Sequence, residues 1–169
     1  MQSNYTKTMK KINLPLILIH LIATIFIIFS FQKFVGIFYF ELFELVIQHG
    51  LTNFLENSQK YGYLTSDMGY FSMVINMSSL FAILISFIIS IWISLKENYS
   101  IVNSIILMFL AFLLDRFNML NWITLKHFPS YLIDNIFYSS IIGSVIFLCI
   151  GLFIFITKRL NNIIKKYNC

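Results

Sequence analysis

Charged side chains are the scarcest class in this sequence. Only 11% of the 169 residues are Asp, Glu, Lys or Arg, whereas 59% are hydrophobic. A soluble domain carries about 25% charged residues, so this chain lacks the polar surface that a water-soluble fold needs. The composition therefore argues against a soluble enzyme or binding domain and predicts an integral membrane protein.

Cysteines and catalytic signatures are also in short supply. The two cysteines are Cys149, inside an apolar run, and Cys169, and no CxxC pair exists. This argues against a disulfide framework and against dithiol redox chemistry carried by this chain alone. HExxH, GxSxG, the P-loop and the dinucleotide-binding fingerprint are missing too. The sequence therefore predicts no catalytic residue and no cofactor, and it leaves open whether the protein is an enzyme.

Four long apolar runs dominate what remains. They cover about residues 12–34, 68–95, 98–122 and 135–157, and each is close to the roughly 20 residues that a helix needs to cross a bilayer. In lipid each run must be helical, because the backbone finds hydrogen-bond partners only within the segment. The sequence thus predicts an all-α bundle of four transmembrane helices, a single membrane domain over residues 1–169, with an outer loop at 38–67.

The positive charges predict the orientation of these spans. The net charge is +5, and most of the basic residues lie in the two terminal arms and the 96–100 loop. These residues are Lys7, Lys10, Lys11, Lys96, Lys158, Arg159, Lys165 and Lys166. The positive-inside rule then places both termini in the cytoplasm of a bacterial inner (plasma) membrane. The same distribution favours the lipid bilayer as partner and argues against nucleic acid.

Small residues recur at every fourth position through most of the second span. They are Ser78, Ala82, Ser86, Ser90 and Ser94. Such rows let helix backbones approach closely, so the pattern predicts a helix-packing ridge; the alternative is a polar pathway lined by serine hydroxyls. The fourth span has a shorter version, Ser139-xxx-Gly143 followed by Gly151, which we expect to pack against the second span or a partner.

Asp115 and Arg116 are adjacent charges near the outer end of the third span. Asp115, Asn118 and Trp122 share one helical seam, while Arg116 is turned about 100° away. We expect Asp115 to point into the bundle and Arg116 to reach the outer headgroups. Candidate partners for the carboxylate are Arg116, Lys33, Lys126 and Asn76. Its role is either a structural ion pair or ion, proton or substrate binding.

His20 lies near the middle of the first span and is the only histidine in any span. A transmembrane bis-histidine haem therefore lacks its second ligand, and we expect a neutral imidazole bonded to a neighbouring helix. A metal ligand or proton relay is the alternative.

The stretch YFELFELVIQHG, residues 39–50, predicts an amphipathic helix that ends at Gly50. It places Glu41, Glu44 and Gln48 on one stripe, opposite Phe40 and Phe43 among others. Such a helix suits the outer membrane interface. Glu41 and Glu44 are candidate binding residues, but His49 lies off their stripe, so no metal site is predicted.

The stretch IFIIFSFQKFVG, residues 25–36, resembles the first span of the DoxX and MauE group of small four-span membrane proteins. In that group an aromatic run and a small residue precede a lysine, and Ser30 and Lys33 take those places here. Ser30 replaces the group's usual glycine, and the second span lacks the acidic and glycine features of the group. The resemblance implies an accessory role in a redox or thiol-linked pathway.

Three functional hypotheses follow. The first is an accessory or structural subunit, not catalytic by itself, bound to another membrane protein or forming a homo-oligomer. The second is a small transporter or ion-handling protein that uses Asp115, with Asn76 and Asn118 lining an outer-facing cavity. The third is a membrane enzyme acting on lipid or quinone, which requires a lipid-sized groove at the outer face reaching Glu41, Asp115 or Asp134.

Overall fold

The computed structural model describes residues 12–157, and every regular element in this range is a helix. Three helices are long and apolar enough to cross a membrane: α1 (Leu14–Phe38), α4 (Thr65–Lys96) and α7 (Ile136–Ile156). At 1.5 Å per residue, these helices are about 38, 48 and 32 Å long, and a hydrocarbon core is about 30 Å thick. The prediction of an all-helical membrane protein is therefore confirmed.

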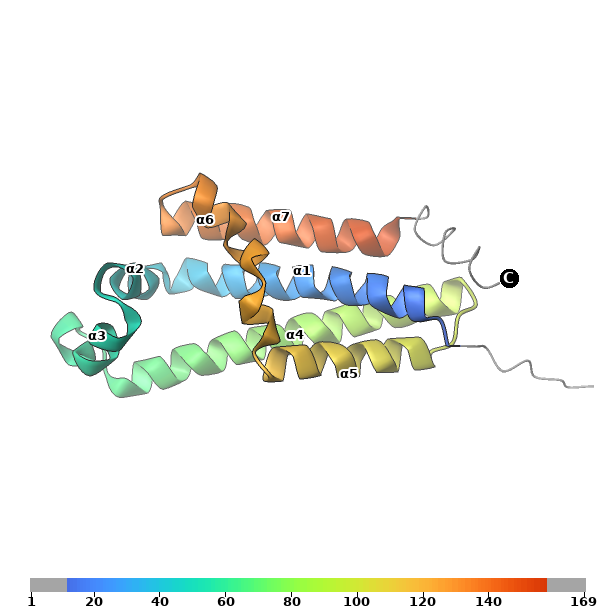
Figure 1. Cartoon of the computed structure of the whole chain (residues 1–169), viewed down its shortest axis with the longest axis horizontal. Coiled ribbons are helices and arrows are strands. Elements are labelled where there is room, and N and C mark those ends of the chain that lie inside the picture. Colours follow the sequence, from blue (N-terminus) through green and yellow to red (C-terminus); the bar gives the residue numbers. More distant parts are fainter. Residues whose placement is uncertain (1–11, 158–169) are drawn as a thin grey trace, which may run out of the picture.

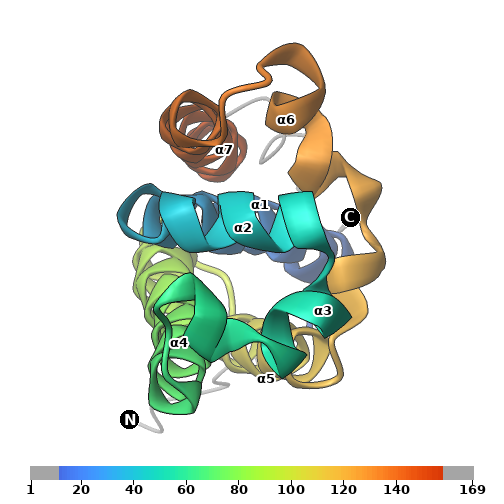
Figure 2. The same ribbon diagram turned by 90° about the vertical axis from the view of Figure 1, so that its left-hand side faces the viewer.

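Helix α1 is the centre of the arrangement. Helix α7 packs on one side of it, and α4 and α5 (Val102–Arg116) pack on the other (Figure 1 and Figure 2). Helices α1 and α5 run in one direction, while α4 and α7 run in the opposite direction (Figure 1). The described beginning of α1 and the end of α7 therefore lie at the same end of the bundle.

Helix α5 is shorter than the span predicted at 98–122. It has 15 residues, or about 22 Å, which is less than the thickness of the hydrocarbon core. The helix ends at Arg116 because Asn118 adopts a left-handed conformation with φ of 54°. The predicted seam of Asp115, Asn118 and Trp122 is therefore wrong beyond Asp115, and Trp122 is 86% exposed.

The connection between α5 and α7, residues 117–135, is a series of short turns. It contains η2 (Met119–Trp122), η3 (Thr124–His127) and α6 (Phe128–Leu132). Figures 1 and 2 show it running from the α5 side of the bundle, past α1, to the α7 side. Irregular backbone among membrane helices is tolerated where protein covers it or where it lines a cavity. We call residues 117–135 the crossing segment.

The outer loop folds into α2 (Phe40–His49), α3 (Leu51–Glu56) and η1 (Ser58–Tyr61). Gly50 ends α2 with a positive φ of 76°, which a glycine adopts without strain. Two aromatic side chains of α2 contact the bundle: Phe40 lies 5.4 Å from Phe137, and Phe43 lies 5.2 Å from Phe71, between ring centroids. Part of the apolar face of α2 is therefore covered by protein, and its placement at the membrane interface stays a prediction.

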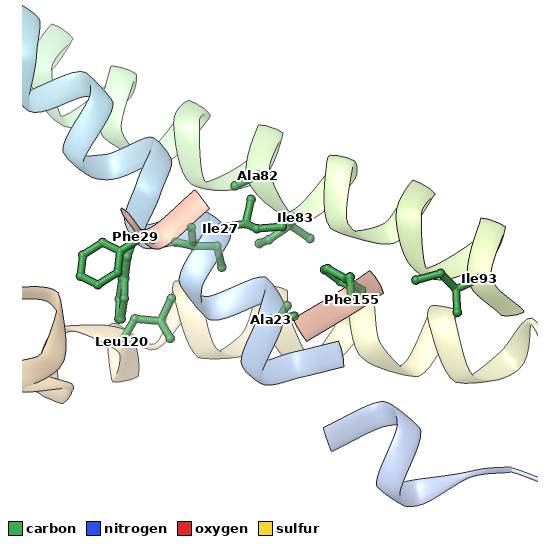
Figure 3. Packing of buried hydrophobic residues seen from close by; sticks show 11 residues of the cluster. Ala23, Ile27, Phe29, Ala82, Ile83, Ile93, Leu120 and Phe155 are labelled. Carbon is green, nitrogen blue, oxygen red and sulfur yellow. The ribbon is translucent and has the colours of Figure 1, made fainter. Parts of the chain in front are cut away.

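The buried core lies around the middle of α1 (Figure 3). Ala23 and Ile27 of α1 belong to the same buried cluster as Ala82 of α4 and Phe155 of α7. Leu120 extends this cluster into the crossing segment, which anchors the irregular chain to the bundle. In lipid, packing of this kind holds helices together in place of the hydrophobic effect.

The row of small residues on α4 packs inside this chain. Ala82, Ser86, Ser90 and Ser94 are fully buried, and Ser78 is half-buried. Hydrogen bonds from this row reach α1 and α5. The ridge is therefore occupied by intramolecular neighbours.

The small residues of α7 face α1 and α6, not the second span as the sequence had suggested. A Cβ on Gly151 would lie 2.7 Å from Ile27 Cγ1, and a Cβ on Gly143 would lie 2.9 Å from Pro129 Cγ. Ser30 Oγ donates a hydrogen bond of 2.7 Å to the Ser144 carbonyl oxygen. These close approaches explain why this face of α7 has no room for larger side chains.

Much of the predicted orientation depends on residues outside the described range. Seven of the basic residues that carry it are Lys7, Lys10, Lys11, Lys158, Arg159, Lys165 and Lys166, and Cys169 lies there as well. Only Lys96 of that set is described, at the end of α4, where its Nζ lies 5.0 Å from the centroid of the Trp92 ring.

Candidate functional site

A cavity of about 670 Å³ lies between α1, α2, α4, the end of α5, α7 and the crossing segment. Small-molecule sites in proteins occupy about 300–1,000 Å³, so this space suits a ligand of ordinary metabolite or lipid-headgroup size. It lies toward the end of the bundle where α1 ends and α7 begins (Figure 1). We call it the outer-end cavity.

The walls of the outer-end cavity combine charged, polar and apolar side chains. The ionisable ones are Lys33, Asp115, Lys126, His127 and Asp134. The amides and hydroxyls are Gln32, Asn76, Ser79, Asn118, Asn121, Ser130, Ser139 and Ser140. The apolar ones are Phe29, Phe43, Ile47, Ile75, Leu120, Ile133 and Ile136. Such a mixture suits a ligand with both a polar and an apolar part.

Asp115 lies half-buried on the α4–α5 wall. Its carboxylate interacts with the hydroxyl of Ser79, which also accepts a hydrogen bond of 3.0 Å from Gln32 Nε2. Asn76 and Asn118 line the same cavity. The structure thus brings together the three residues that the transporter hypothesis named: Asp115, Asn76 and Asn118.

Arg116 does not line this cavity, although its charge acts on Asp115. Its guanidinium carbon lies 5.3 Å from the centroid of the Phe112 ring, and the side chain is exposed. The two adjacent charged side chains therefore lie in different environments: Asp115 lines the cavity, and Arg116 lies on the surface of the bundle.

Three cationic or basic side chains form another part of the wall. Lys33 Nζ donates a hydrogen bond of 3.2 Å to Ser130 Oγ, and Lys126 Nζ donates one of 2.6 Å to Asn121 Oδ1. Burial lowers the pKa of Lys126. Burial first, and then the charges of Lys126 and Lys33, lower the pKa of His127 from its ordinary value of 6.5. We call Lys33, Lys126 and His127 the basic cluster.

Close packing fixes the crossing segment against the helices that carry the cavity. Pro129 rests on the bare backbone of Gly143, and Ser139 Oγ donates a hydrogen bond of 3.2 Å to Ser130 Oγ. A Cβ on Gly36 would lie 2.9 Å from Ser140 Oγ, so α1 and α7 meet closely at the same level. The basic cluster is therefore held by contacts from α1, α6 and α7.

His20 lies outside the cavity, in a buried polar network nearer the opposite end. Its Nδ1 is 3.0 Å from Ser90 Oγ, and Ser90 Oγ is 2.9 Å from Ser104 Oγ. Its ring also lies 4.9 Å from that of Phe155, between centroids. The imidazole thus joins α1 to α4 and packs against α7.

Glu41 and Glu44 line a separate hollow of about 370 Å³ on α2, together with Gln48, Tyr61 and Tyr63. Burial first, and then the charges of Glu41 and Asp67, raise the pKa of Tyr63. Within residues 12–157, no group of three His, Cys, Asp or Glu side chains is arranged to hold a metal ion. The outer acidic residues therefore divide: Asp115 and Asp134 line the large cavity, whereas Glu41 and Glu44 do not.

Sequence reasoning missed the basic cluster as a unit. The sequence indicates Lys33 and Lys126 as candidate partners of Asp115, and Lys33 also through the resemblance of residues 25–36, but it gives no reason to group them with His127. Lys33 and Lys126 are 93 positions apart in the sequence. Only the path of the crossing segment brings them to the same cavity. No periodic pattern encodes that path.

Comparisons of this chain with protein-family models, curated proteins and solved structures found no match. The resemblance of residues 25–36 to the DoxX and MauE group therefore stays a prediction.

Proposed function

We propose that this chain is a four-span membrane protein that binds a small amphipathic molecule in the outer-end cavity. The observation that carries the proposal is the cavity itself, because it holds charged groups and apolar walls in one space. Ionisable side chains among membrane helices are costly, and they mark functional sites by default. A purely structural bundle has no need of such a space.

The proposal is closest to the third hypothesis, a protein acting on lipid or quinone. That hypothesis required a groove reaching Glu41, Asp115 or Asp134, and the cavity contains the two aspartates. The transporter hypothesis also remains, because Asp115, Asn76 and Asn118 line the cavity. The subunit hypothesis stays a prediction, but the ridge that supported it is filled by α1 and α5 of this chain.

For the topology, we propose that α5 and the turn η2 after it make the fourth crossing, within the predicted span 98–122, with both termini in the cytoplasm. The end of α4 and the beginning of α5 lie at the end of the bundle opposite α2 and α3 (Figure 1). This arrangement suits the positive-inside rule, which assigns the 96–100 loop to the cytoplasm. The cavity would then open toward the outer side.

Native mass spectrometry of the protein, gently extracted from its own membrane, tests the proposed ligand. We expect a retained small-molecule mass in the wild type and in Met77→Trp, and loss of that mass in Asn76→Trp. Asn76 lines the cavity, whereas its neighbour Met77 is 53% exposed on α4 outside it. If both variants retain the small molecule equally, the cavity is not its binding site. A stoichiometric protein partner without a small molecule would favour the subunit hypothesis.

Thiol labelling tests the topology. In a Cys149→Ser, Cys169→Ser background, a membrane-impermeant reagent applied outside should label Gln59→Cys in η1. Ser100→Cys, between α4 and α5, should react only after the membrane is permeabilised. The reverse pattern would contradict the proposed orientation.

A further inference from the structure

Among the described residues, the two lysines of the basic cluster have no acidic hydrogen-bond partner. The hydrogen-bond acceptors of Lys33 and Lys126 are a hydroxyl and an amide oxygen, both neutral. The charge that acts most on Lys33 is that of Lys126, which repels it. Within the part of the chain that the structure describes, neither ammonium group contacts a carboxylate.

Like charges that face one space attract an anion into it. The two lysines come from different elements, α1 and η3, so the fold places them together despite their repulsion. A phosphate or carboxylate oxygen between them would replace repulsion by charge-assisted hydrogen bonds, which are about twice as strong as neutral ones. Ser130, already bonded to Lys33, offers a further hydroxyl donor at the same place.

The basic cluster lies near the end of α1, at a depth in the membrane that suits a lipid headgroup. Lys33 lies five residues before the end of α1 at Phe38, or about 7.5 Å along the helix axis. Ile47 and Ile133 provide apolar wall beside it, and Ile47 is 70% exposed. A molecule with its charged end at Lys33 and Lys126 can therefore extend an apolar part along these side chains.

We infer that the ligand of the outer-end cavity carries an anionic headgroup, a phosphate or a carboxylate, bound by Lys33, Lys126 and His127. This inference rests on the proposed function, because it names the chemistry of the ligand that the cavity takes. Asp115 lies on the α4–α5 wall with Ser79 and leaves the basic cluster free to bind. The same anion chemistry is found in lipid headgroups and in soluble phosphate, and the experiment distinguishes them.

Binding of defined probes to the full-length protein in detergent tests the inference. The probes are dioleoylphosphatidic acid, oleic acid, dioleoylglycerol and inorganic phosphate. We expect the two anionic lipids to bind at least tenfold more tightly than dioleoylglycerol, which has the same chains as the phosphatidic acid and no charge. Lys33→Gln combined with Lys126→Gln should abolish that preference, while Lys60→Gln, an exposed lysine of η1 outside the cavity, should keep it.

The outcomes separate the inference from the function on which it rests. If dioleoylglycerol binds as tightly as the anionic lipids and Asn76→Trp blocks it, the anionic headgroup is wrong and the amphipathic site stands. If no lipid binds, both fail. If inorganic phosphate alone binds as tightly as phosphatidic acid, the anion site stands and the lipid-like ligand is overturned. Thermal unfolding of each variant identifies loss of binding that is caused by misfolding.

Discussion

His20 of α1 and Ser90 of α4 are joined by a buried hydrogen bond of 3.0 Å between Nδ1 and Oγ. Ser90 is in turn linked to Ser104 of α5, so one short network connects three helices. Ser86, one turn earlier on α4, is equally buried, yet its hydroxyl has no hydrogen-bond partner among the described residues. The two serines provide a matched pair for measuring what the network contributes.

Ser90→Ala should destabilise the protein, whereas Ser86→Ala should have almost no effect. Ser90→Ala removes the hydrogen bonds that Ser90 makes to His20 Nδ1 and to Ser104 Oγ. Hydrogen bonds between membrane helices contribute about 0.6 kcal/mol on average and up to about 1.7 kcal/mol. The second change removes a hydroxyl without a partner. The free energy of unfolding in mixed detergent micelles measures both, and equal values for the two variants would show that His20 is not held through Ser90.

Gly151→Ala should destabilise the bundle by about 1–3 kcal/mol, the usual range for overpacking. The new methyl group would lie 2.9 Å from the backbone oxygen of Ala23 as well as against Ile27. Gly69→Ala is the control, because no atom lies within 4 Å of its Cβ position, and α4 favours alanine over glycine. Unfolding midpoints should therefore shift in opposite directions, and a tolerated Gly151→Ala would disprove close packing of α1 on α7.

Binding of an anionic probe should strengthen as the pH falls below 6.5. In the free protein the pKa of His127 is lowered by burial and by the charges of Lys126 and Lys33, so its imidazole gains a proton at a lower pH than an ordinary histidine does. A bound anion favours the protonated form, so proton uptake accompanies binding and acid increases the affinity.

The same shift predicts the pH dependence of stability. Below pH 6.5 the unfolded chain binds a proton at His127 more readily than the folded protein does, so this residue makes stability fall as the pH drops through that range. Probe titrations and unfolding curves at several pH values measure both effects. His127→Gln should reduce the pH dependence of probe binding, whereas His49→Gln, whose ring stacks on Tyr61 outside the cavity, should leave the pH dependence of binding unchanged.

Asp115→Asn should fold and should bind an anionic probe several-fold more tightly. The amide keeps a polar group beside Ser79, while the change removes a negative charge from the cavity. Glu44→Gln removes a charge from α2 outside the cavity and should leave the affinity unaltered. Weaker binding by Asp115→Asn would instead indicate that the carboxylate itself contacts the ligand, as the transporter hypothesis requires.

The apolar runs of the sequence were enough to predict three membrane helices to within a few residues. They failed at the end of α5, because Phe117, Met119 and Leu120 continue the apolar composition while Asn118 turns the backbone. Hydropathy depends on side-chain composition, so it does not detect a residue whose backbone adopts the left-handed conformation. The helix therefore stopped six residues before the predicted end at Trp122.

The candidate site was predictable only in part. Asp115, Asn76 and Asn118 were identified from the cost of a carboxylate in a span and from nearby amides. The basic cluster depends on where the crossing segment runs, and neither charge patterning nor periodicity specifies the path of an irregular connection. The row of small residues was recognised as a packing surface, but its partners, α1 and α5, became known only from the three-dimensional arrangement.

The contact between Pro129 and Gly143 has a consequence for biogenesis. The crossing segment is synthesised before α7, yet it is held in place by a residue of α7. A nascent chain that has inserted only α1, α4 and α5 therefore has an incomplete cavity wall. The cavity wall is completed last, after α7 has packed on the crossing segment, so under the proposed function a chain terminated within α7 should insert but should not bind the ligand.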